Sequence, residues 1–134
     1  MSDLKLGSNS EMPLSIPKLR DDGNNWPDYE PRIQKAMGAK GLWRHVKGTA
    51  TVPQPYTVVN NVTYLHDLTT VATEDQIENK EIRLADYKKK EYLAQHIILS
   101  TTSMRLGAKI KNLKSAKEMW KVVKTDATTK STLT

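Results

Sequence analysis

The side chains best suited to acid–base or metal chemistry in this sequence are three histidines, His45, His66 and His96. They are far apart, and no two share the four-residue spacing with which histidines bind zinc on one helix face. Histidine is the side chain best suited to proton transfer near neutral pH, but neither His45 nor His96 has a serine, cysteine or carboxylate at a catalytic spacing. The chain has no cysteine, which rules out disulfides, cysteine-based zinc sites and thiol catalysis within it. We therefore expect neither a metal nor a cofactor.

Acidic pairs and glycines give no catalytic motif either. Asp21-Asp22 lies in a turn-forming run, and Glu74-Asp75 opens a predicted helix, where negative charge is favourable beside the N-terminus. The glycines are isolated, so the sequence has no phosphate-binding loop of the GxGxxG or Walker A kind. The sequence predicts a protein that is not an enzyme and has no small-molecule substrate.

Basic residues outnumber acidic ones by 21 to 15, which gives a formal net charge of +6. This balance suits an RNA or membrane surface, and it also suits helices that are simply well solvated. The basic residues are spread along the chain, which favours solvation. The candidates for nucleic-acid contact are two short groups of lysines, Lys88, Lys89, Lys90, Lys109, Lys111 and Lys114. No apolar run approaches the ~20 residues of a membrane span, so we expect a cytoplasmic protein without membrane contact.

Two capping boxes predict where helices begin. Ser115 is followed three places later by Glu118, which predicts a helix from Ala116 with one apolar face. Thr73 is followed by Gln76, which predicts a long helix from about 74 to 100. The first half of that helix is strongly charged and should project or cover the surface, whereas its second half should be core. A shorter apolar segment, 104–110, lies between the two helices.

A first helix is predicted from about Pro27 to Lys40, with Gly41 as its stop. Pro31 either distorts the first turn or moves the start of the regular helix to its own position. Upstream, residues 13–19 should form an extended arm whose Leu14, Ile16 and Leu19 dock on the core. Residues 1–12 are expected to be a flexible tail.

Residues 47–72 change in character, with prolines, threonines and valines around Asn60-Asn61. They predict either a small hairpin or a long irregular loop, and we treat them as an irregular insertion. The fold expected is all-α, a small helical bundle over 13–127, followed by a C-terminal tail or truncated continuation at 128–134. Each tryptophan can stack a base, but each lies in an apolar stripe at helical spacing, which favours packing. The predicted core is Trp26, Tyr29, Ile33, Met37, Leu42, Trp43, Val46, Leu93, Ile97, Ile110, Met119, Trp120 and Val123.

Three blocks of the sequence carry a family resemblance. They are residues 17–29 with PKL and DGNNWPDY, residues 37–46 with AKGLW, and residues 97–120 with IILS and SAKEMW. In this order and spacing the chain resembles the N-terminal part of a Gag polyprotein of Copia-type LTR retrotransposons, over roughly 17–125. The resemblance implies an all-helical domain like a retrotransposon or retroviral capsid N-terminal lobe, which forms homo-oligomers through weak contacts and assembles into particles around element RNA.

The sequence departs from the family pattern in two respects. The zinc knuckle with which Gag proteins bind RNA is missing, so RNA binding is expected mainly through regions that this chain does not contain. Pro31 and the insertion between Thr49 and Thr70 are also unlike the commonest pattern. The alternatives to a structural Gag domain are a basic RNA-binding module or a peptide-docking helical module of a domesticated Gag-derived protein.

Overall fold

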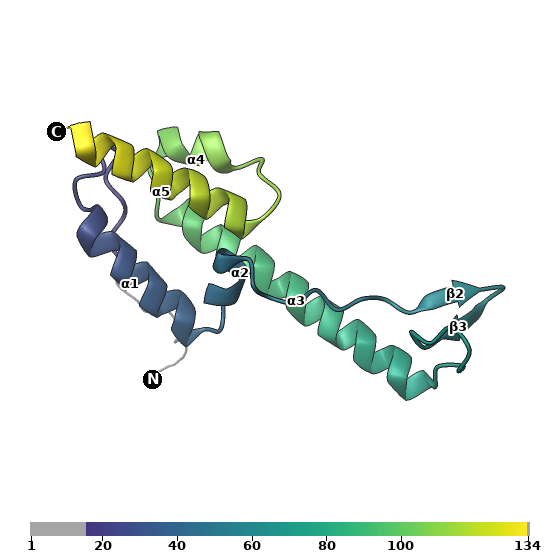
Figure 1. The fold of residues 1–134 in the computed structure, drawn as a ribbon. Helices are drawn as coiled ribbons and strands as arrows, with labels where there is room; N and C mark the ends of the chain where they lie inside the picture. Colours follow the sequence, from purple (N-terminus) through teal and green to yellow (C-terminus); the bar gives the residue numbers. More distant parts are fainter. Residues whose placement is uncertain (1–15, 134) are drawn as a thin grey trace.

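A bundle of helices occupies one end of the molecule, and a long arm projects from it (Figure 1). The computed structural model describes residues 16–133, with side chains described as far as Lys130. The elements of this part are α1 (Trp26–Ala39), α2 (Trp43–Lys47), β2 (Thr57–Val59), β3 (Val62–Tyr64), α3 (Glu74–Ser100), α4 (Met104–Ile110) and α5 (Ala116–Leu133). The described chain is therefore mostly helical with one small two-stranded sheet. The tail expected over 1–12 lies outside the described residues, and so does Leu14 of the extended segment predicted at 13–19.

Both predicted capping boxes mark helix starts at the expected positions. Thr73 Oγ1 accepts from the backbone N–H of Gln76 at 3.1 Å, and Gln76 Oε1 accepts from that of Thr73 at 2.8 Å. Ser115 Oγ accepts from the N–H of Glu118 at 3.1 Å. The glutamate does not return the bond to Ser115, because its carboxylate accepts from the N–H of Lys114 at 3.4 Å.

α1 begins at Trp26 and runs through Pro31, so the alternative of a start at Pro31 is wrong. Pro31 removes one helical hydrogen bond, the one to the carbonyl of Pro27, and both prolines are exposed to water. Gly41 has φ +72°, and the N–H of Leu42 donates to the carbonyl of Met37 at 2.8 Å, which closes the end of the helix as predicted.

The core lies between α1, α2, α4, α5 and the last two turns of α3, on which buried Ala94, Ile97 and Ile98 lie. Of the predicted core, Trp43 is half-buried against this cluster, and the prediction is wrong for Leu93, because this residue is 37% exposed. Leu93 precedes Ala94, so it lies about 100° away from it on the flank of the helix. The other predicted core residues are buried.

The segment before α1 docks on the bundle as expected for its described residues. Leu19 is buried, and its N–H donates to the carbonyl of Thr101 at 2.7 Å. Ile16 packs against the same core.

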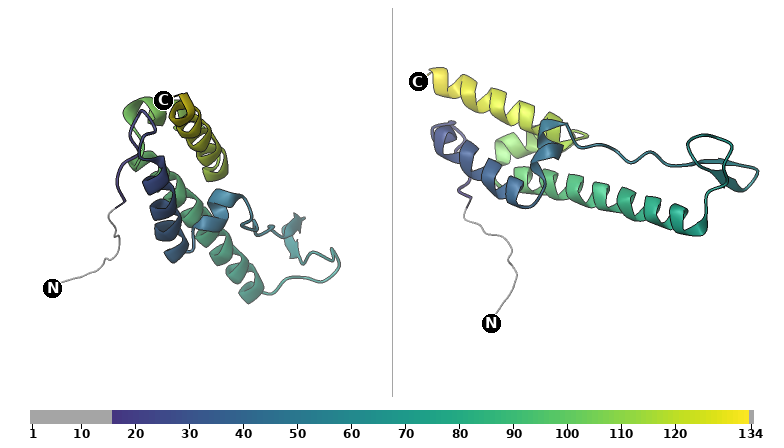
Figure 2. Two further views of the ribbon diagram at one scale, coloured as in Figure 1. Left: turned by 60° about the vertical axis from the view of Figure 1, so that its left-hand side comes forward. Right: turned by 60° about the horizontal axis from the view of Figure 1, so that its bottom comes forward.

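The expectation of a long irregular loop at 47–72 is wrong in its centre, which is a β-hairpin. β2 pairs antiparallel with β3, with Val59 opposite Val62, and an isolated bridge joins Tyr64 to Val71. Asn60 and Asn61 have φ of 53° and 66°, the left-handed values that a two-residue hairpin turn of type I′ requires. The hairpin lies at the far end of the arm, beyond the first turns of α3 (Figures 1 and 2).

The end of the chain also differs from the expected tail, because α5 continues to Leu133. One of its threonines, Thr128, fits the helix by bonding to the preceding turn. Thr128 Oγ1 donates to the carbonyl of Lys124 at 2.7 Å.

Candidate interaction surfaces

Trp120 lies at the centre of an aromatic cluster in which the three sequence blocks meet. Its ring centroid lies 5.4 Å from that of Trp26, 6.2 Å from that of Tyr29 and 5.7 Å from that of Trp43. Trp26 and Trp120 are 7% and 8% exposed, so their faces are not open to stack a base. The cluster joins α1, α2 and α5, and its role is packing.

Thr101, just after α3, is a buried polar junction that the sequence patterns do not reveal. Its hydroxyl donates to the carbonyl of Ile97 at 2.8 Å, and it lies 2.7 Å from the hydroxyl of Tyr29. Because the single hydroxyl hydrogen of Thr101 goes to Ile97, Tyr29 must be the donor in the second bond. Burial raises the pKa of the Tyr29 phenol, which keeps the phenol protonated for this purpose. The junction fixes α1 against the end of α3.

His45 and Glu91 form a second buried junction, on the other side of the bundle. His45 Nδ1 lies 3.1 Å from Glu91 Oε1, and the two side chains are only 4% and 14% exposed. The other oxygen, Oε2, accepts from the backbone N–H of Ala116 and from Gln95 Nε2, each at 2.7 Å. Glu91 therefore joins α2 and α3 to the first turn of α5. Nothing local in the sequence signals this pairing, since His45 and Glu91 are 46 residues apart.

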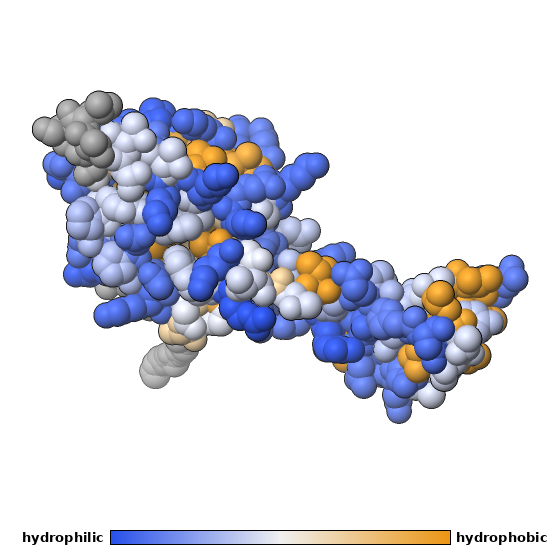
Figure 3. Space-filling view, in the orientation of Figure 1, coloured by the Kyte–Doolittle hydropathy of each residue, from blue (hydrophilic) through white to orange (hydrophobic). Residues whose placement is uncertain are grey.

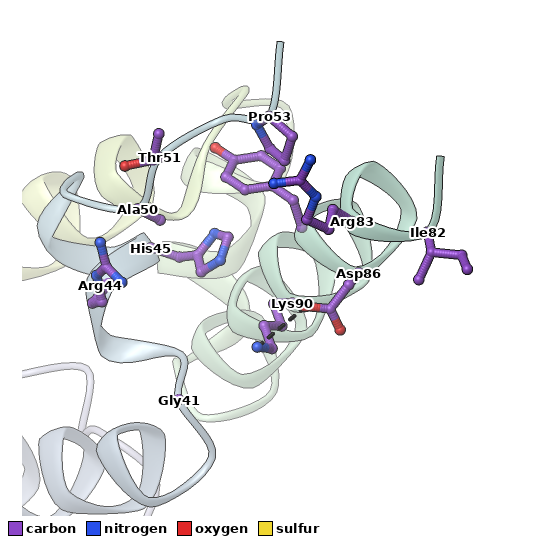
Figure 4. A pocket seen from close by; sticks show the side chains of 11 residues that line it. Gly41, Arg44, His45, Ala50, Thr51, Pro53, Ile82, Arg83, Asp86 and Lys90 are labelled. Atoms are coloured by element: carbon purple, nitrogen blue, oxygen red, sulfur yellow. Dashed lines mark ion pairs between the residues drawn. The ribbon is translucent and has the colours of Figure 1, made fainter. Parts of the chain in front are cut away.

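A cavity of about 570 Å³ lies beside that junction, between α2, residues 50–53 and the middle of α3 (Figure 4). The acidic residue in its lining, Asp86, pairs with Lys90 at 3.2 Å. His45 also lines the cavity, with its Nδ1 held by Glu91, and its ring lies against that of Tyr87 at 4.8 Å between centroids. Within the described part of the chain, no group of three or more His, Cys, Asp or Glu residues is placed to hold a metal ion. The lining offers the cationic side chains of Arg44, Arg83 and Lys90 beside the His45–Glu91 pair.

A network of charged side chains joins the opposite end of the bundle. Arg105 donates from Nε to Asp21 and from a terminal nitrogen to Asp126, both at 2.8 Å. Ser103 Oγ donates to the same oxygen of Asp21 at 2.6 Å. These bonds from Ser103 and Arg105 hold the pKa of Asp21 below its usual range. The network ties the turn before α1 to α4 and α5, which is a structural role for one of the two acidic pairs noted in the sequence.

The first group of lysines considered for nucleic-acid contact does not point to one side of its helix. Lys88, Lys89 and Lys90 are consecutive on α3, so their side chains point about 100° apart, and Lys90 is half-buried beside Asp86. The second group is exposed at and after the end of α4, at Lys109, Lys111 and Lys114. Lys109 also lines a cavity of about 560 Å³ between α4 and α5.

Exposed apolar side chains concentrate on the arm. Figure 3 shows orange patches on its far end, over the hairpin and the neighbouring turns. Eight of the exposed large apolar residues of the described chain lie between residues 52 and 93, and the ninth is Met104. The eight are Val52, Val58, Val59, Leu68, Val71, Ile82, Tyr92 and Leu93. The bundle therefore buries most of its apolar side chains but leaves Tyr92, Leu93 and Met104 exposed, while the arm leaves most of its own in solvent.

Comparison with known proteins gives no relative for this chain. No family model, no curated protein and no solved structure matches it. No helix of the described residues is long and apolar enough to cross a membrane.

Proposed function

We propose that this chain is a structural domain that associates with copies of itself, as the resemblance to Copia-type Gag proteins implies. The observation that carries the proposal is the arm. It projects from the bundle and bears most of the exposed large apolar side chains of the described chain, namely Val52, Val58, Val59, Leu68, Val71 and Ile82 (Figures 1 and 3). Apolar surface that a monomer leaves in water is favoured at contacts between proteins.

The aromatic cluster supports the capsid-like interpretation of the fold. The blocks that carry the Gag resemblance include Trp26, Trp43 and Trp120, and these side chains pack against one another. In this interpretation the shared residues of the family serve to hold the bundle together. The surface that departs from the family pattern, including the inserted hairpin, is then available for contacts between copies. Capsid-type assemblies repeat modest contacts many times, so each contact is weak and the assembly gains strength by avidity.

Sedimentation of the full chain tests self-association directly. We expect the mean mass to rise with protein concentration up to ~1 mM, where an association of about 4 kcal/mol becomes visible. Electron microscopy of the concentrated protein should then show ordered assemblies or paired particles. A monomer at every concentration and salt would contradict the proposal.

An RNA-binding module is the second candidate, favoured by one observation. Lys109, Lys111 and Lys114 are exposed and close in sequence, and their side chains make no ion pair with other described residues. If these three lysines each neutralise a phosphate of single-stranded RNA, log K should fall with log salt with a slope of about −2. Changing all three to glutamine should abolish that slope. No RNA affinity at ~50 mM salt would eliminate this candidate.

A further inference from the structure

A stripe of exposed residues runs along the outer face of α3, with alternating spacings of three and four. Its members are Asp75, Glu78, Ile82, Ala85, Lys89, Tyr92 and His96, and every one is exposed. This spacing keeps side chains on one narrow face of a helix, and it is the spacing of the seam between paired helices. The opposite face of the helix carries Ala94 and Ile98, which pack into the bundle.

The stripe is free along the projecting part of the helix. Ile82 lies at the rim of the cavity, and its side chain points away from His45 (Figure 4). Ile82 is 58% exposed, and Tyr92 is 64% exposed. The residues flanking the hairpin contact Lys80, which lies roughly half a turn around the helix from Glu78 and Ile82. No described part of the chain covers this face.

The charges along the stripe are arranged with opposite signs at its two ends. Asp75 and Glu78 are acidic, Ile82 and Ala85 form an uncharged centre, and Lys89 is basic. Neither Glu78 nor Lys89 makes an ion pair with another described residue. A second α3 placed parallel would set each charge against its own kind. An antiparallel α3 would set Glu78 of each copy against Lys89 of the other, which gives two equivalent ion pairs.

We propose that two copies of this chain pair antiparallel through the outer stripe of α3, with the twofold axis between Ile82 and Ala85. In this register Ile82 lies against Ala85 of the second copy, and the small alanine side chains let the helices approach closely. Two symmetric ion pairs between Glu78 and Lys89 then flank the apolar centre. The pairing rests on the proposed self-association and assigns it a surface and a direction.

The projecting arm is suited to this arrangement. An antiparallel pair of arms places the two bundles at opposite ends, where they do not compete for the same space. The seam from Asp75 to Tyr92 is about 26 Å long, which is a short helix-to-helix contact and smaller than a standard stable interface. The contact should therefore be weak, and it should weaken further with salt because its ion pairs are exposed.

Charge reversal in the full chain tests the pairing. Glu78→Lys and Lys89→Glu each convert both symmetric ion pairs into like-charge contacts, so each should weaken association by about tenfold or more at ~50 mM salt. The double variant Glu78→Lys/Lys89→Glu restores opposite charges and should associate like wild type. An equimolar mixture of the two single variants should form heterodimers. Arg83→Glu makes the same charge change as Lys89→Glu on the cavity side of the helix, and it should leave association unchanged.

Sedimentation velocity measures association for each protein, and far-ultraviolet circular dichroism checks that each keeps its helices. Loss in both single variants with recovery in the double variant supports the antiparallel stripe. Wild-type association that both single reversals leave unchanged would overturn the stripe but leave self-association standing. A wild-type protein that stays monomeric up to ~1 mM would overturn both.

Discussion

Removing the carboxylate of Glu91 should destabilise the bundle more than any other change to a charged side chain on α3. In the structure that carboxylate accepts from His45 Nδ1, from the N–H of Ala116 and from Gln95 Nε2. The His45 side chain is 4% exposed and Ala116 is fully buried, so Glu91→Ala leaves two donors without water or protein partners. Gln95 is half-buried and can turn toward solvent at little cost.

The magnitude follows from those two donors. Each unsatisfied buried donor costs about 1–3 kcal/mol, and partial relaxation of the site places the expected total at about 3 kcal/mol. Glu91→Gln keeps the shape and one acceptor oxygen, so it should cost roughly half as much. Glu81→Ala changes an exposed carboxylate of the same helix and should stay within about 0.5 kcal/mol of wild type.

Urea unfolding followed by tryptophan fluorescence measures these differences, and the slope of the transition should not change between the variants. Hydrogen exchange at the Ala116 amide should also accelerate in Glu91→Ala, because that N–H loses its acceptor. A Glu91→Ala protein within about 1 kcal/mol of wild type, with unchanged exchange at Ala116, would refute the view that this carboxylate holds α2, α3 and α5 together.

Two glycines and one aspartate give further predictions. Gly23 and Gly41 have similar φ values of +74° and +72°, but a Cβ at Gly23 would lie 2.7 Å from the carbonyl oxygen of Ala127, whereas one at Gly41 meets nothing within 4 Å. Gly41→Ala should cost about 1 kcal/mol for its backbone alone, and Gly23→Ala should cost clearly more; equal losses in urea unfolding would contradict the described contact with α5. Asp67 accepts from the Thr70 hydroxyl and from the N–H groups of Thr70 and Thr69, which lowers the pKa of its carboxyl from 3.8 to about 2. Because the folded pKa is depressed, the turn's stabilisation is complete above about pH 4 and is lost as the pH falls toward 2; a carboxyl carbon NMR titration of Asp67 with a midpoint near 4 would refute it.

Helix starts could be predicted from the sequence because their chemistry is local. Thr73 and Gln76 are one turn apart and satisfy each other's backbone groups, and Ser115 accepts from the N–H of Glu118 over the same spacing, so each pattern lies within four residues. The apolar stripe of α5 was predictable for the same reason. Its period fixes which side chains share a face.

The polar junctions could not be predicted, because their members meet only in the folded chain. His45 and Glu91, or Tyr29 and Thr101, come from distant parts of the chain and follow no spacing rule. Leu93 shows the limit of counting apolar residues on a long helix. Its burial depends on which side of α3 meets the bundle, and a shift of one residue turns a side chain by about 100°.

The sequence was compatible with either a hairpin or an irregular loop, and packing on α3 positions the hairpin. Asn60-Asn61 suits a type I′ turn, but an isolated two-stranded hairpin is marginally stable in water. Here the residues on either side of it pack on the first turns of α3. The Lys80 ammonium lies 4.6 Å from the ring centroid of Tyr56 and 3.3 Å from His66 Nε2.

The length of α3 is itself an argument for a partner on the arm. The buried residues of this 27-residue helix, Ala94, Ile97 and Ile98, all lie in its last two turns. The first twenty residues bury no side chain completely, and helices of this kind gain most of their stability in proteins from packing one face. The hairpin segment packs on one side of that part and leaves the stripe from Asp75 to Tyr92 in water. A second copy on the stripe would bury Ile82 and pair the charges of Glu78 and Lys89. Because association stabilises the paired form by mass action, the stability of the arm should rise with protein concentration, as association does.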